Sequence, residues 1–399
     1  MTPPKPAHAR PVAPDVERLM TGTPIIHWSR KERINAIYRG LFDLQAAVGF
    51  KDVGIWPFGK TVPDAAQIEY AAQSGNKQHK TAVAKWAKRM FLTWQFNWCD
   101  RFFARRPDAF VVIWNGIKGH RRVLADAATA RGMPVIYFEE APLPARVTID
   151  FAGVNFGSSL PRRIGFYHDW LAQSGVAPDR WRDLRSQLVP RKADRDDVGQ
   201  GASDAALGAE KFIFCPLQVP GDSQITIYGD WITSVDHMID ELARAAQALP
   251  DGWHLRIKEH PSARISFGEK LAALAGPKFR VDNSTDTFAQ VSAARAVVNV
   301  NSSVGLQAFF FDKPVLVLGE AFYAFDHLAH KVSDAQELAQ VLSAPEKLAF
   351  DAGARDAFMS YLDAAYYPRV AAVIDGSFGL ADLVARDKLR DQILTRGAG

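Results

Sequence analysis

The second half of the chain alternates short apolar runs with segments of helical periodicity, and this alternation restricts the possible folds more than any other feature. The runs are rich in β-branched and aromatic residues and end in polar loops: 211–217, 253–258, 279–282, 296–300 and 314–318. Between the first two, apolar residues recur at helical spacing from Ile232 to Leu249, with Asp230 placed as the N-cap. Strand–helix alternation of this kind predicts an α/β fold with a parallel sheet wrapped by helices.

The first half repeats the scheme less regularly. Segments 109–114 and 134–138 have the character of strands, and they flank a predicted helix over 119–131. Two earlier segments, 25–28 and 48–55, are further strand candidates. The N-terminal half is therefore also expected to form an α/β domain.

Chain length and local composition set the expected domain boundaries. A chain of 399 residues is longer than one core usually holds, since domains typically have about 100–200 residues. Residues 191–209 are polar, rich in Gly, Ala and Asp, and without periodicity, which is typical of a linker. We expect an N-terminal domain over 1–190, a C-terminal domain over 210–333, and a helical tail over 334–399 that packs back on the domains.

Composition and charge exclude several classes of protein. The chain has 48 Lys and Arg against 44 Asp and Glu, and a net charge of +4 is too small to indicate nucleic-acid binding. Of the two cysteines, Cys215 lies in an apolar run, which favours a reducing compartment over an oxidising one. The first residues lack the apolar core of a signal peptide, and no stretch reaches the ~18–20 apolar residues of a membrane span. We expect a soluble, cytoplasmic protein with no nucleic-acid partner.

Two short motifs imitate functional sites. Residues 54–61 match the P-loop pattern letter for letter, but Pro57 has no backbone N–H for a phosphate, and Trp56 and Phe58 are bulky. Asp194-Arg195-Asp196 matches a metal-binding D-x-D, yet it lies in the polar linker instead of at the end of a strand. We interpret the first as a turn and the second as a chance match.

Polar residues follow the predicted strands of the C-terminal domain, where ligands of parallel α/β sheets bind. Asn301-Ser302-Ser303 opens a helical stretch, and free N–H groups there favour an anion, although many helices simply begin with such a cap. Lys258 and His260 lie two apart at a strand end, which suits a phosphodiester leaving group or merely a solvated strand end. Asp222 lies in a Gly-Asp-Ser turn, where aspartate is also common for conformational reasons.

The N-terminal domain offers an acidic pair, Glu139-Glu140, after the predicted strand 134–138. In a two-domain cleft one of these carboxylates could act as general acid/base while a carboxylate on the other domain acts as nucleophile, as in retaining sugar chemistry. The alternative is an acidic loop without catalytic function.

Three sequence motifs occur in order, each at a predicted strand end: CPLQVPGDSQI at 215–225, IKEHP at 257–261 and VNVNSSVGL at 298–306. An N-terminal stretch over 138–162 contains FEE, VTID, GVN and SSLPR. These motifs resemble the capsule polysaccharide biosynthesis family of bacteria, particularly the glycosyltransferases that build the β-Kdo linker on a lyso-phosphatidylglycerol anchor. The resemblance covers about residues 105–330. It implies a GT-B fold, with two Rossmann-like domains facing a cleft, a CMP-Kdo donor, no metal or other cofactor, and retention of configuration.

The resemblance also implies roles for individual residues. Asp222 is expected to be the nucleophile, and Glu139 or Glu140 the acid/base. The remaining matched residues are expected to bind the donor. His260, Lys258, Ser302 and Ser303 would hold the CMP phosphate and ribose, Gln218 and Gln224 would contact the sugar, and Asn301 would complete the donor site. A different nucleotide donor (a UDP-sugar or a CDP-polyol) and a non-catalytic component of capsule assembly are the alternatives.

A lipid-linked acceptor implies contact with the inner face of the cytoplasmic membrane and with other capsule-assembly proteins. Residues 85–106 mix six basic residues with Trp and Phe, a composition that suits an anionic membrane interface. The alternative is an amphipathic helix whose aromatic side chains pack into the N-terminal core.

Overall fold

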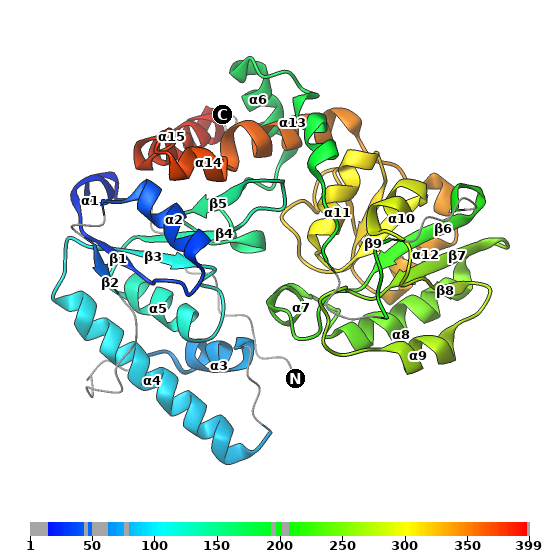
Figure 1. Ribbon diagram of the computed structural model, residues 1–399, viewed down its shortest axis with the longest axis horizontal. Helices are drawn as coiled ribbons and strands as arrows, with labels where there is room; N and C mark the ends of the chain where they lie inside the picture. The colour runs from blue at the N-terminus through cyan, green and yellow to red at the C-terminus, as the bar shows by residue number, and fades with distance from the viewer. Residues whose placement is uncertain are drawn as a thin grey trace. The chain divides into compact units, whose positions relative to one another are not determined.

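The computed structural model describes residues 15–43, 47–49, 63–75, 80–192, 197–201 and 207–396. The chain forms two compact units, each built around its own sheet (Figure 1). Unit 1 comprises Met1–Leu160 with Leu362–Gly399, and unit 2 comprises Pro161–Tyr361. The α/β class, the two parallel sheets and the helical C-terminal region predicted from the sequence are confirmed.

Unit 1 has a five-stranded sheet of order β2-β1-β3-β4-β5, in which only β5 is antiparallel to its neighbour. The strands are β1 (Pro24–Ile26), β2 (Val48–Gly49), β3 (Phe110–Trp114), β4 (Val135–Glu140) and β5 (Val147–Asp150). The helices are α1 (Val16–Thr21), α2 (Glu32–Leu41), α3 (Ala65–Ser74), α4 (Ala82–Ala104), α5 (Gly119–Ala130), α14 (Val370–Ile374) and α15 (Leu380–Arg396).

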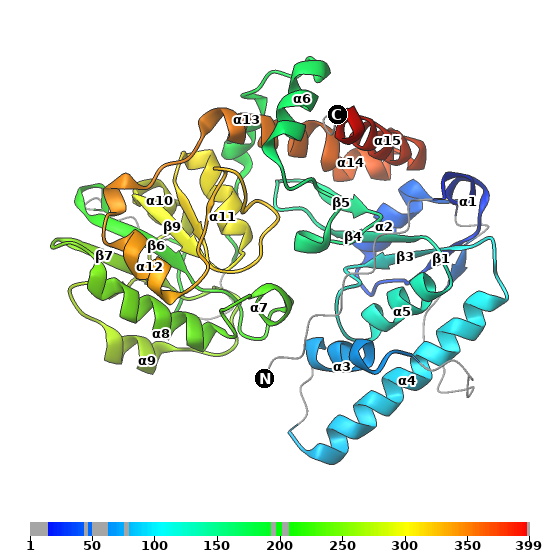
Figure 2. The same cartoon turned by 180° about the vertical axis from the view of Figure 1, so that it is seen from behind.

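The two faces of this sheet are covered by different helices, as both ribbon views show (Figure 2). Because side chains alternate along a strand, Val111 and Ile113 of β3 pack with α3, α4 and α5, while Phe110 and Val112 pack with α2, α14 and α15. The C-terminal helices therefore complete the core of the N-terminal half of the chain.

Unit 2 has a six-stranded, all-parallel sheet of order β11-β10-β9-β6-β7-β8. The strands are β6 (Lys211–Pro216), β7 (Trp253–Lys258), β8 (Phe279–Val281), β9 (Ala296–Asn299), β10 (Val315–Val317) and β11 (His330–Lys331). The helices are α6 (Ile164–Ser174), α7 (Ser223–Tyr228), α8 (Val235–Ala245), α9 (Gly268–Leu274), α10 (Thr287–Ala293), α11 (Ser303–Gln307), α12 (Ala335–Leu342) and α13 (Ala352–Tyr361).

The observed division of the chain differs from the predicted boundaries. Residues 161–190 belong to unit 2, because α6 packs on α13 through aromatic contacts of Tyr361 with Phe166 and Trp170, both at ring separations of 5.1 Å. The segment expected to be a linker is also part of unit 2, where the Gly199 N–H donates to the Asn283 carbonyl at 2.7 Å. The expected tail divides between the units after Tyr361.

Several local expectations change as well. Helix α8 is capped by Ser234, whose hydroxyl accepts from the His237 N–H, and not by Asp230, whose carboxylate pairs with Lys331 at 2.7 Å. Of the candidate strand 48–55 the structure describes only Val48–Gly49. The P-loop match at 54–61 and the Asp194-Arg195-Asp196 motif lie outside the described residues.

Candidate functional site

The sheet of unit 2 has a topological switch point between β6 and β9. From β6 the chain proceeds to β7 and β8 on one side, and then returns to β9 and β10 on the other. Loops after the two central strands diverge at such a point, and ligands of open α/β sheets bind in the crevice that they leave. The predicted residues after β6 and β9 lie at this point.

A pair of buried amides joins the two loops. The Gln218 side chain donates to Asn301 Oδ1 at 3.1 Å, and its oxygen accepts from the Asn301 backbone N–H at 3.1 Å. The Asn301 amide nitrogen donates to the carbonyls of Gln224 at 2.7 Å and Tyr228 at 3.0 Å. Both amides therefore hold the loops and α7 in position, and we name the Gln218–Asn301 pair the amide brace.

A second network supports the start of α11. Asn299 accepts from the Ser302 N–H at 2.7 Å and from the Tyr323 hydroxyl at 3.0 Å. A Cβ atom on Gly305 would lie 2.3 Å from that hydroxyl, so only glycine fits against the network. Ser302 caps α11 by accepting from the Val304 N–H at 3.2 Å, and both Ser302 and Ser303 are half-buried.

Asp222 is half-buried and caps α7. Its carboxylate accepts from the Gln224 N–H at 3.1 Å, and its own N–H donates to the Val219 carbonyl at 3.1 Å. The conformational role of this aspartate is thus present, since the cap fixes the carboxylate at the start of α7, in the loop that follows β6. Gln224, also half-buried, follows on the first turn of α7.

Lys258 departs from the prediction that it holds a phosphate. Its ammonium is buried and donates to the carbonyls of Gly199, Asn283 and Thr285 at 2.7, 2.8 and 2.8 Å. Burial lowers its pKa to about 8, although the negative charges of Asp282 and Asp286 raise it. An ammonium has three N–H donors, and all three are used here, so none remains for a ligand. Lys258 instead connects the loop that contains Gly199 with the loop that contains Asn283 and Thr285.

His260 stays at the edge while its neighbour Glu259 is buried. His260 Nδ1 accepts from the Ser262 N–H at 3.1 Å, so in the neutral ring the proton is on Nε2. The Glu259 carboxylate accepts from the Phe267 N–H at 3.1 Å and is structural. Of the Lys-Glu-His motif, the histidine is half-buried, whereas the side chains of the lysine and the glutamate are buried.

The acidic pair of unit 1 lies at the end of β4, and its members differ. Half-buried Glu139 accepts from the Asn115 amide at 2.5 Å and from the Glu140 N–H at 3.0 Å. Burial raises the pKa of Glu139, and the charge of the neighbouring Glu140 raises it further. The hydrogen bond from Asn115 and the charge of Arg121 lower the same pKa, but they do not cancel the effect of burial. Glu140 is exposed and pairs with Arg33 at 3.4 Å.

Sequence reasoning missed the groups that surround Glu139. Asn115 follows β3 with a positive φ of 69°, and the next residue is Gly116, where a Cβ would lie 2.7 Å from the Tyr137 ring. A polar residue and a glycine directly after an apolar strand could have been recognised by the same rule that selected the loops of unit 2.

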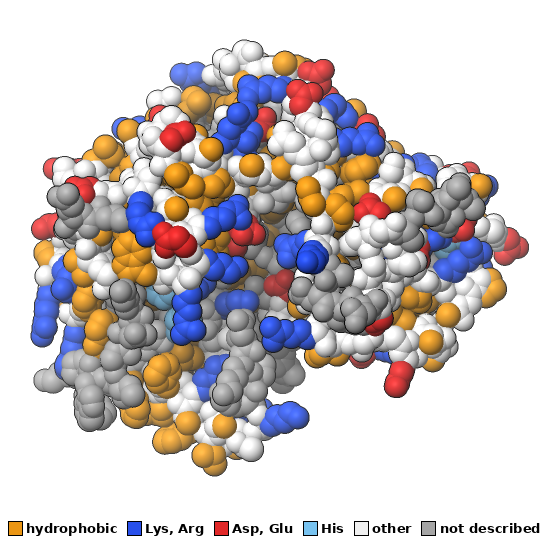
Figure 3. Space-filling view, in the orientation of Figure 1, with side chains coloured by type: hydrophobic (Ala, Val, Ile, Leu, Met, Phe, Trp, Pro, Cys, Tyr) orange, Lys and Arg blue, Asp and Glu red, His pale blue; other side chains and the backbone are white. Residues whose placement is uncertain are grey.

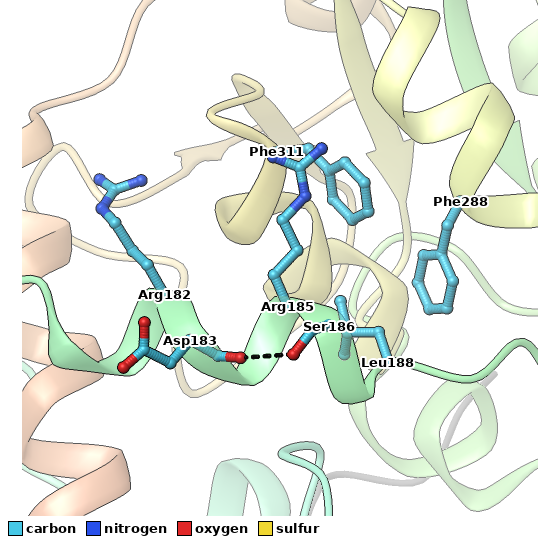
Figure 4. A pocket seen from close by; sticks show the side chains of 7 residues that line it. All are labelled: Arg182, Asp183, Arg185, Ser186, Leu188, Phe288 and Phe311. Atoms are coloured by element: carbon cyan, nitrogen blue, oxygen red, sulfur yellow. Dashed lines mark hydrogen bonds between the residues drawn. The ribbon is translucent and has the colours of Figure 1, made fainter.

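A hollow of about 650 Å³ lies elsewhere on unit 2 (Figure 4). Phe288 and Phe311 stack at 5.8 Å in its wall, and the Arg185 guanidinium lies 4.4 Å from the centre of the Phe311 ring. None of the predicted site residues lines this hollow.

The aromatic residues of the basic segment in unit 1 divide between core and surface. Phe96 and Phe103, in the second half of α4, are buried in the core as the packing alternative predicted. Three large apolar residues of its first half are exposed, Val83 at 75%, Trp86 at 61% and Phe91 at 43%. Figure 3 shows hydrophobic side chains on the surface at the bottom of the view, where α4 begins.

In the described part of the chain, no group of three or more His, Cys, Asp or Glu side chains is arranged to hold a metal ion. Among the same residues, no helix is long and apolar enough to cross a membrane.

Known proteins resemble this chain as follows. Protein FixF of Sinorhizobium fredii is 28% identical over 272 residues, 67% of this chain and 63% of FixF. Capsule polysaccharide modification protein LipB of Neisseria meningitidis is 31% identical over 121 residues, 28% of this chain and 29% of LipB. The chain thus spans less than two thirds of the length of these curated relatives.

A solved structure and a family model complete the comparison. KpsC of Thermosulfurimonas dismutans, a beta Kdo 2,7 transferase, has a TM-score of 0.46 at 13% identity, covering 89% of this chain and 98% of KpsC. The family model of the capsule polysaccharide biosynthesis protein matches residues 186–367, which include the amide brace and Asp222. The resemblance to the capsule polysaccharide biosynthesis family that was predicted from the sequence is confirmed by this match.

Proposed function

We propose that the protein is a retaining glycosyltransferase of capsular polysaccharide biosynthesis that transfers Kdo from CMP-Kdo to a lipid-linked acceptor. The observation that supports the proposal is the amide brace, which joins the loop after β6 to the loop after β9 and bonds the Gln224 carbonyl, two residues from Asp222. Open α/β sheets bind ligands at this position, so we propose that the two family motifs act as one site.

In the proposed reaction the Asp222 carboxylate attacks the anomeric carbon of Kdo, and the bond from that carbon to the phosphate oxygen breaks. CMP leaves with the bonding electrons and a glycosyl–aspartate ester remains. The acceptor hydroxyl then attacks the same carbon, its proton passes to a carboxylate, and the ester bond breaks to release Asp222. Two displacements retain the configuration.

On the donor side, the His260 Nε2–H and the hydroxyls of Ser302 and Ser303 are proposed to bind the phosphate and ribose of CMP. Gln224 is proposed to contact the sugar, while Gln218 and Asn301 position the loops. Lys258 is left out of this set because its three N–H groups are already donated to backbone carbonyls. The proposal involves no metal or other cofactor.

On the acceptor side we assign Glu139, and not Glu140, as the acid/base. The raised pKa of Glu139 brings the group closer to the range in which a carboxyl both accepts and donates protons near neutral pH. Asn115 fixes its orientation, whereas Glu140 is exposed and paired with Arg33.

The first half of α4 is the proposed membrane contact. At 100° per residue, exposed Val83, Trp86 and Phe91 fall on one side of the helix, and Lys85 falls on the other. An apolar face with basic flanks suits the interface of an anionic bilayer at the cytoplasmic side. Contact with other capsule-assembly proteins at the membrane is part of the same proposal.

The decisive experiment combines purified protein with CMP-Kdo and a short-chain lyso-phosphatidylglycerol and follows the lipid by mass. Wild type should add Kdo to the lipid. The Asp222→Asn variant keeps a good helix cap and removes the nucleophile, so it should fold normally and lose product by about 10³-fold or more. Product from a UDP-sugar or CDP-polyol instead would support the alternative donors. Capsule formation in cells carrying Asp222→Asn would support the non-catalytic alternative.

Membrane contact has its own test, because it does not depend on the donor. Wild-type protein should co-sediment with vesicles of anionic lipid at low salt, and Trp86→Ser should weaken this. Unchanged sedimentation of the variant would contradict the role of α4.

A further inference from the structure

The hollow of unit 2 shown in Figure 4 has the size and the lining of a binding site. Its volume of about 650 Å³ lies within the range of about 300–1,000 Å³ that is typical of pockets for small molecules. One wall is the 3₁₀-helix η2 (Arg180–Gln187), and the other consists of Phe288 on α10 and Phe311 on the 3₁₀-helix η5 (Ala308–Phe311). No residue with a role in the proposed reaction lines the hollow, so a ligand bound here would be additional to the donor and acceptor at the reacting groups.

Helix η2 places one of its faces in the core of unit 2 and another at the hollow. It has eight residues, whereas 3₁₀-helices rarely exceed about four, and its side chains three residues apart share a face. Trp181 and Leu184 form the buried face. Arg182 and Arg185 form another, and both line the hollow together with Leu188, three residues further along. Burial of the first face therefore fixes the two arginines at the hollow.

The two arginines differ in how their charges are neutralised. Arg182 pairs with Asp312 at 2.9 Å and with Asp356 at 3.2 Å, so its charge is balanced within the chain. Arg185 is exposed, and in the part of the chain that the structure describes its guanidinium neither pairs with a carboxylate nor donates a hydrogen bond. Asp183 also lines the hollow, but Figure 4 shows its carboxylate at the far end from the two phenylalanine rings. Of the two lining arginines, Arg185 is the one available to an external anion.

An aromatic platform lies directly beside this charge. The Arg185 guanidinium lies 4.4 Å from the centre of the Phe311 ring, a cation–π contact that engages none of its N–H donors. Phe288 stacks on Phe311 at a ring separation of 5.8 Å and an interplanar angle of 13°, and Leu188 adds to the apolar lining. An arginine with free N–H groups binds a carboxylate through two parallel hydrogen bonds. Together these groups match a ligand that carries a carboxylate on a ring with an apolar face.

We infer that the hollow binds a sugar acid, with its carboxylate on the Arg185 guanidinium and the C–H face of its ring on Phe288, Phe311 and Leu188. A neutral sugar would leave the charge of Arg185 unpaired, and a small anion would leave the apolar wall uncovered. The inference rests on the proposed function in one respect, that the sugar acid is a Kdo residue of the acceptor or product. It adds to the proposed reaction a second site, which retains the glycan apart from the reacting groups.

Titration calorimetry with the methyl glycoside of Kdo tests the inference, with saturating CMP present to occupy the donor site. The glycoside should bind wild type. Its carboxamide, which has the same ring without the negative charge, should bind about tenfold more weakly or worse. Equal binding of the acid and the carboxamide would overturn the role of Arg185. Benzoate carries a carboxylate on a flat aromatic ring, and tighter binding of benzoate than of the glycoside would overturn the assignment to a sugar.

Three variants locate the bound sugar. Arg185→Gln changes an exposed side chain, so it should fold like wild type, and it should weaken binding of the glycoside by about tenfold or more. Phe311→Leu keeps an apolar side chain but removes the ring, and should weaken binding severalfold. Arg105→Gln removes an exposed arginine at the end of α4, so it is the matched control for net charge and should bind like wild type. Equal weakening by Arg105→Gln and Arg185→Gln would show a general effect of charge and would contradict a site in the hollow.

Kdo transfer separates this site from the reacting groups. With lyso-phosphatidylglycerol, an acceptor that carries no Kdo, Arg185→Gln should form product at the rate of wild type. Loss of that transfer in a normally folded variant would mean that the hollow belongs to the reacting site, and would overturn a second site.

Failure of this inference is distinguishable from failure of the proposed function. If the glycoside does not bind wild type, or if Arg185→Gln and Phe311→Leu both bind it like wild type, the sugar site is wrong even when Kdo transfer is observed. If the glycoside binds and both variants weaken it while no donor yields product, the sugar site stands and the proposed reaction is wrong.

Discussion

The carboxyl edges of the two sheets differ in how far their polar groups are satisfied by the chain itself. In unit 2, Gln218, Asn301 and Lys258 are buried and bonded to one another or to backbone groups. The buried Asn299 side chain accepts two hydrogen bonds through its oxygen, and only its amide nitrogen lacks a partner among the described residues. In unit 1, Tyr38 and the Arg121 Nε lack hydrogen-bond partners among the described residues. A largely satisfied edge is rigid and preorganised for a ligand, whereas the edge of unit 1 keeps buried polar groups without partners among the described residues.

The largest expected effect comes from breaking the satisfied edge. Lys258→Met leaves the carbonyls of Gly199, Asn283 and Thr285 without their donor and should reduce the free energy of unfolding by about 3 kcal/mol or more. Arg121→Met in unit 1 removes one hydrogen bond among the described residues, to the Trp114 carbonyl, and should cost about 1 kcal/mol or less. Urea denaturation of both variants measures the difference, and equal losses would contradict the contrast between the edges.

Acid should weaken unit 1 through His27. Its pKa is about 4 in the folded protein against 6.5 as the ordinary value, so between these pH values the unfolded chain binds more protons. Stability should therefore fall as the pH drops from about 6.5 to 4, by about 2 kcal/mol once the partial exposure of the ring is allowed for.

The histidine variants identify the source of this acid sensitivity. His27→Gln should flatten the pH dependence over the same interval, while His168→Gln, which changes an exposed histidine of unit 2, should leave it unchanged. An identical pH dependence in wild type and His27→Gln would show that another group is responsible.

The contrast between the edges also explains which parts of the site could be predicted. Asp222, His260 and Asn301 could be placed because each follows an apolar strand, and strand ends are visible in the sequence. The orientation of Lys258 could not, since every residue of β7 is buried and the alternation that normally assigns a face is absent. The sequence shows Arg121 in the basic first turn of a helix. Its position near the ends of β1 and β3 could not be predicted, because only the sheet order shows that these strands are neighbours.

The domain boundaries illustrate the same limit. The polar composition of 191–209 is typical of a linker, yet Gly199 and Gln200 bond to unit 2, with the Thr287 N–H donating to the Gln200 side chain at 2.9 Å. Composition reports local polarity, while membership of a unit depends on partners far away in the sequence. The chain passes from unit 2 back to unit 1 after Tyr361, and the sequence gives no sign of this boundary because the helix continues through it.

Packing around the satisfied edge gives an intermediate effect. Gly305→Ala would put a Cβ 2.3 Å from the Tyr323 hydroxyl and 2.4 Å from the Asn299 amide nitrogen, and should cost about 1–3 kcal/mol. Gly132→Ala is the control for added volume, because no atom lies within 4 Å of the new methyl group, although its positive φ of 62° adds some strain. Thermal unfolding should show the larger loss for Gly305→Ala, and a larger loss for the control would mean that α11 can shift to make room.

The smallest effect separates two roles of one residue. Asp222 caps α7 through the Gln224 N–H, so Asp222→Ala should cost about 1 kcal/mol, while Asp222→Asn and Asp222→Ser keep an acceptor and should cost at most a few tenths. If Asp222 is also the nucleophile, all three variants should lose transfer equally despite their different stabilities. Activity that instead follows stability, with Asn and Ser retained and Ala reduced, would mean that the carboxylate acts only as a cap. The satisfied edge of unit 2 would then hold a donor without supplying the reacting group.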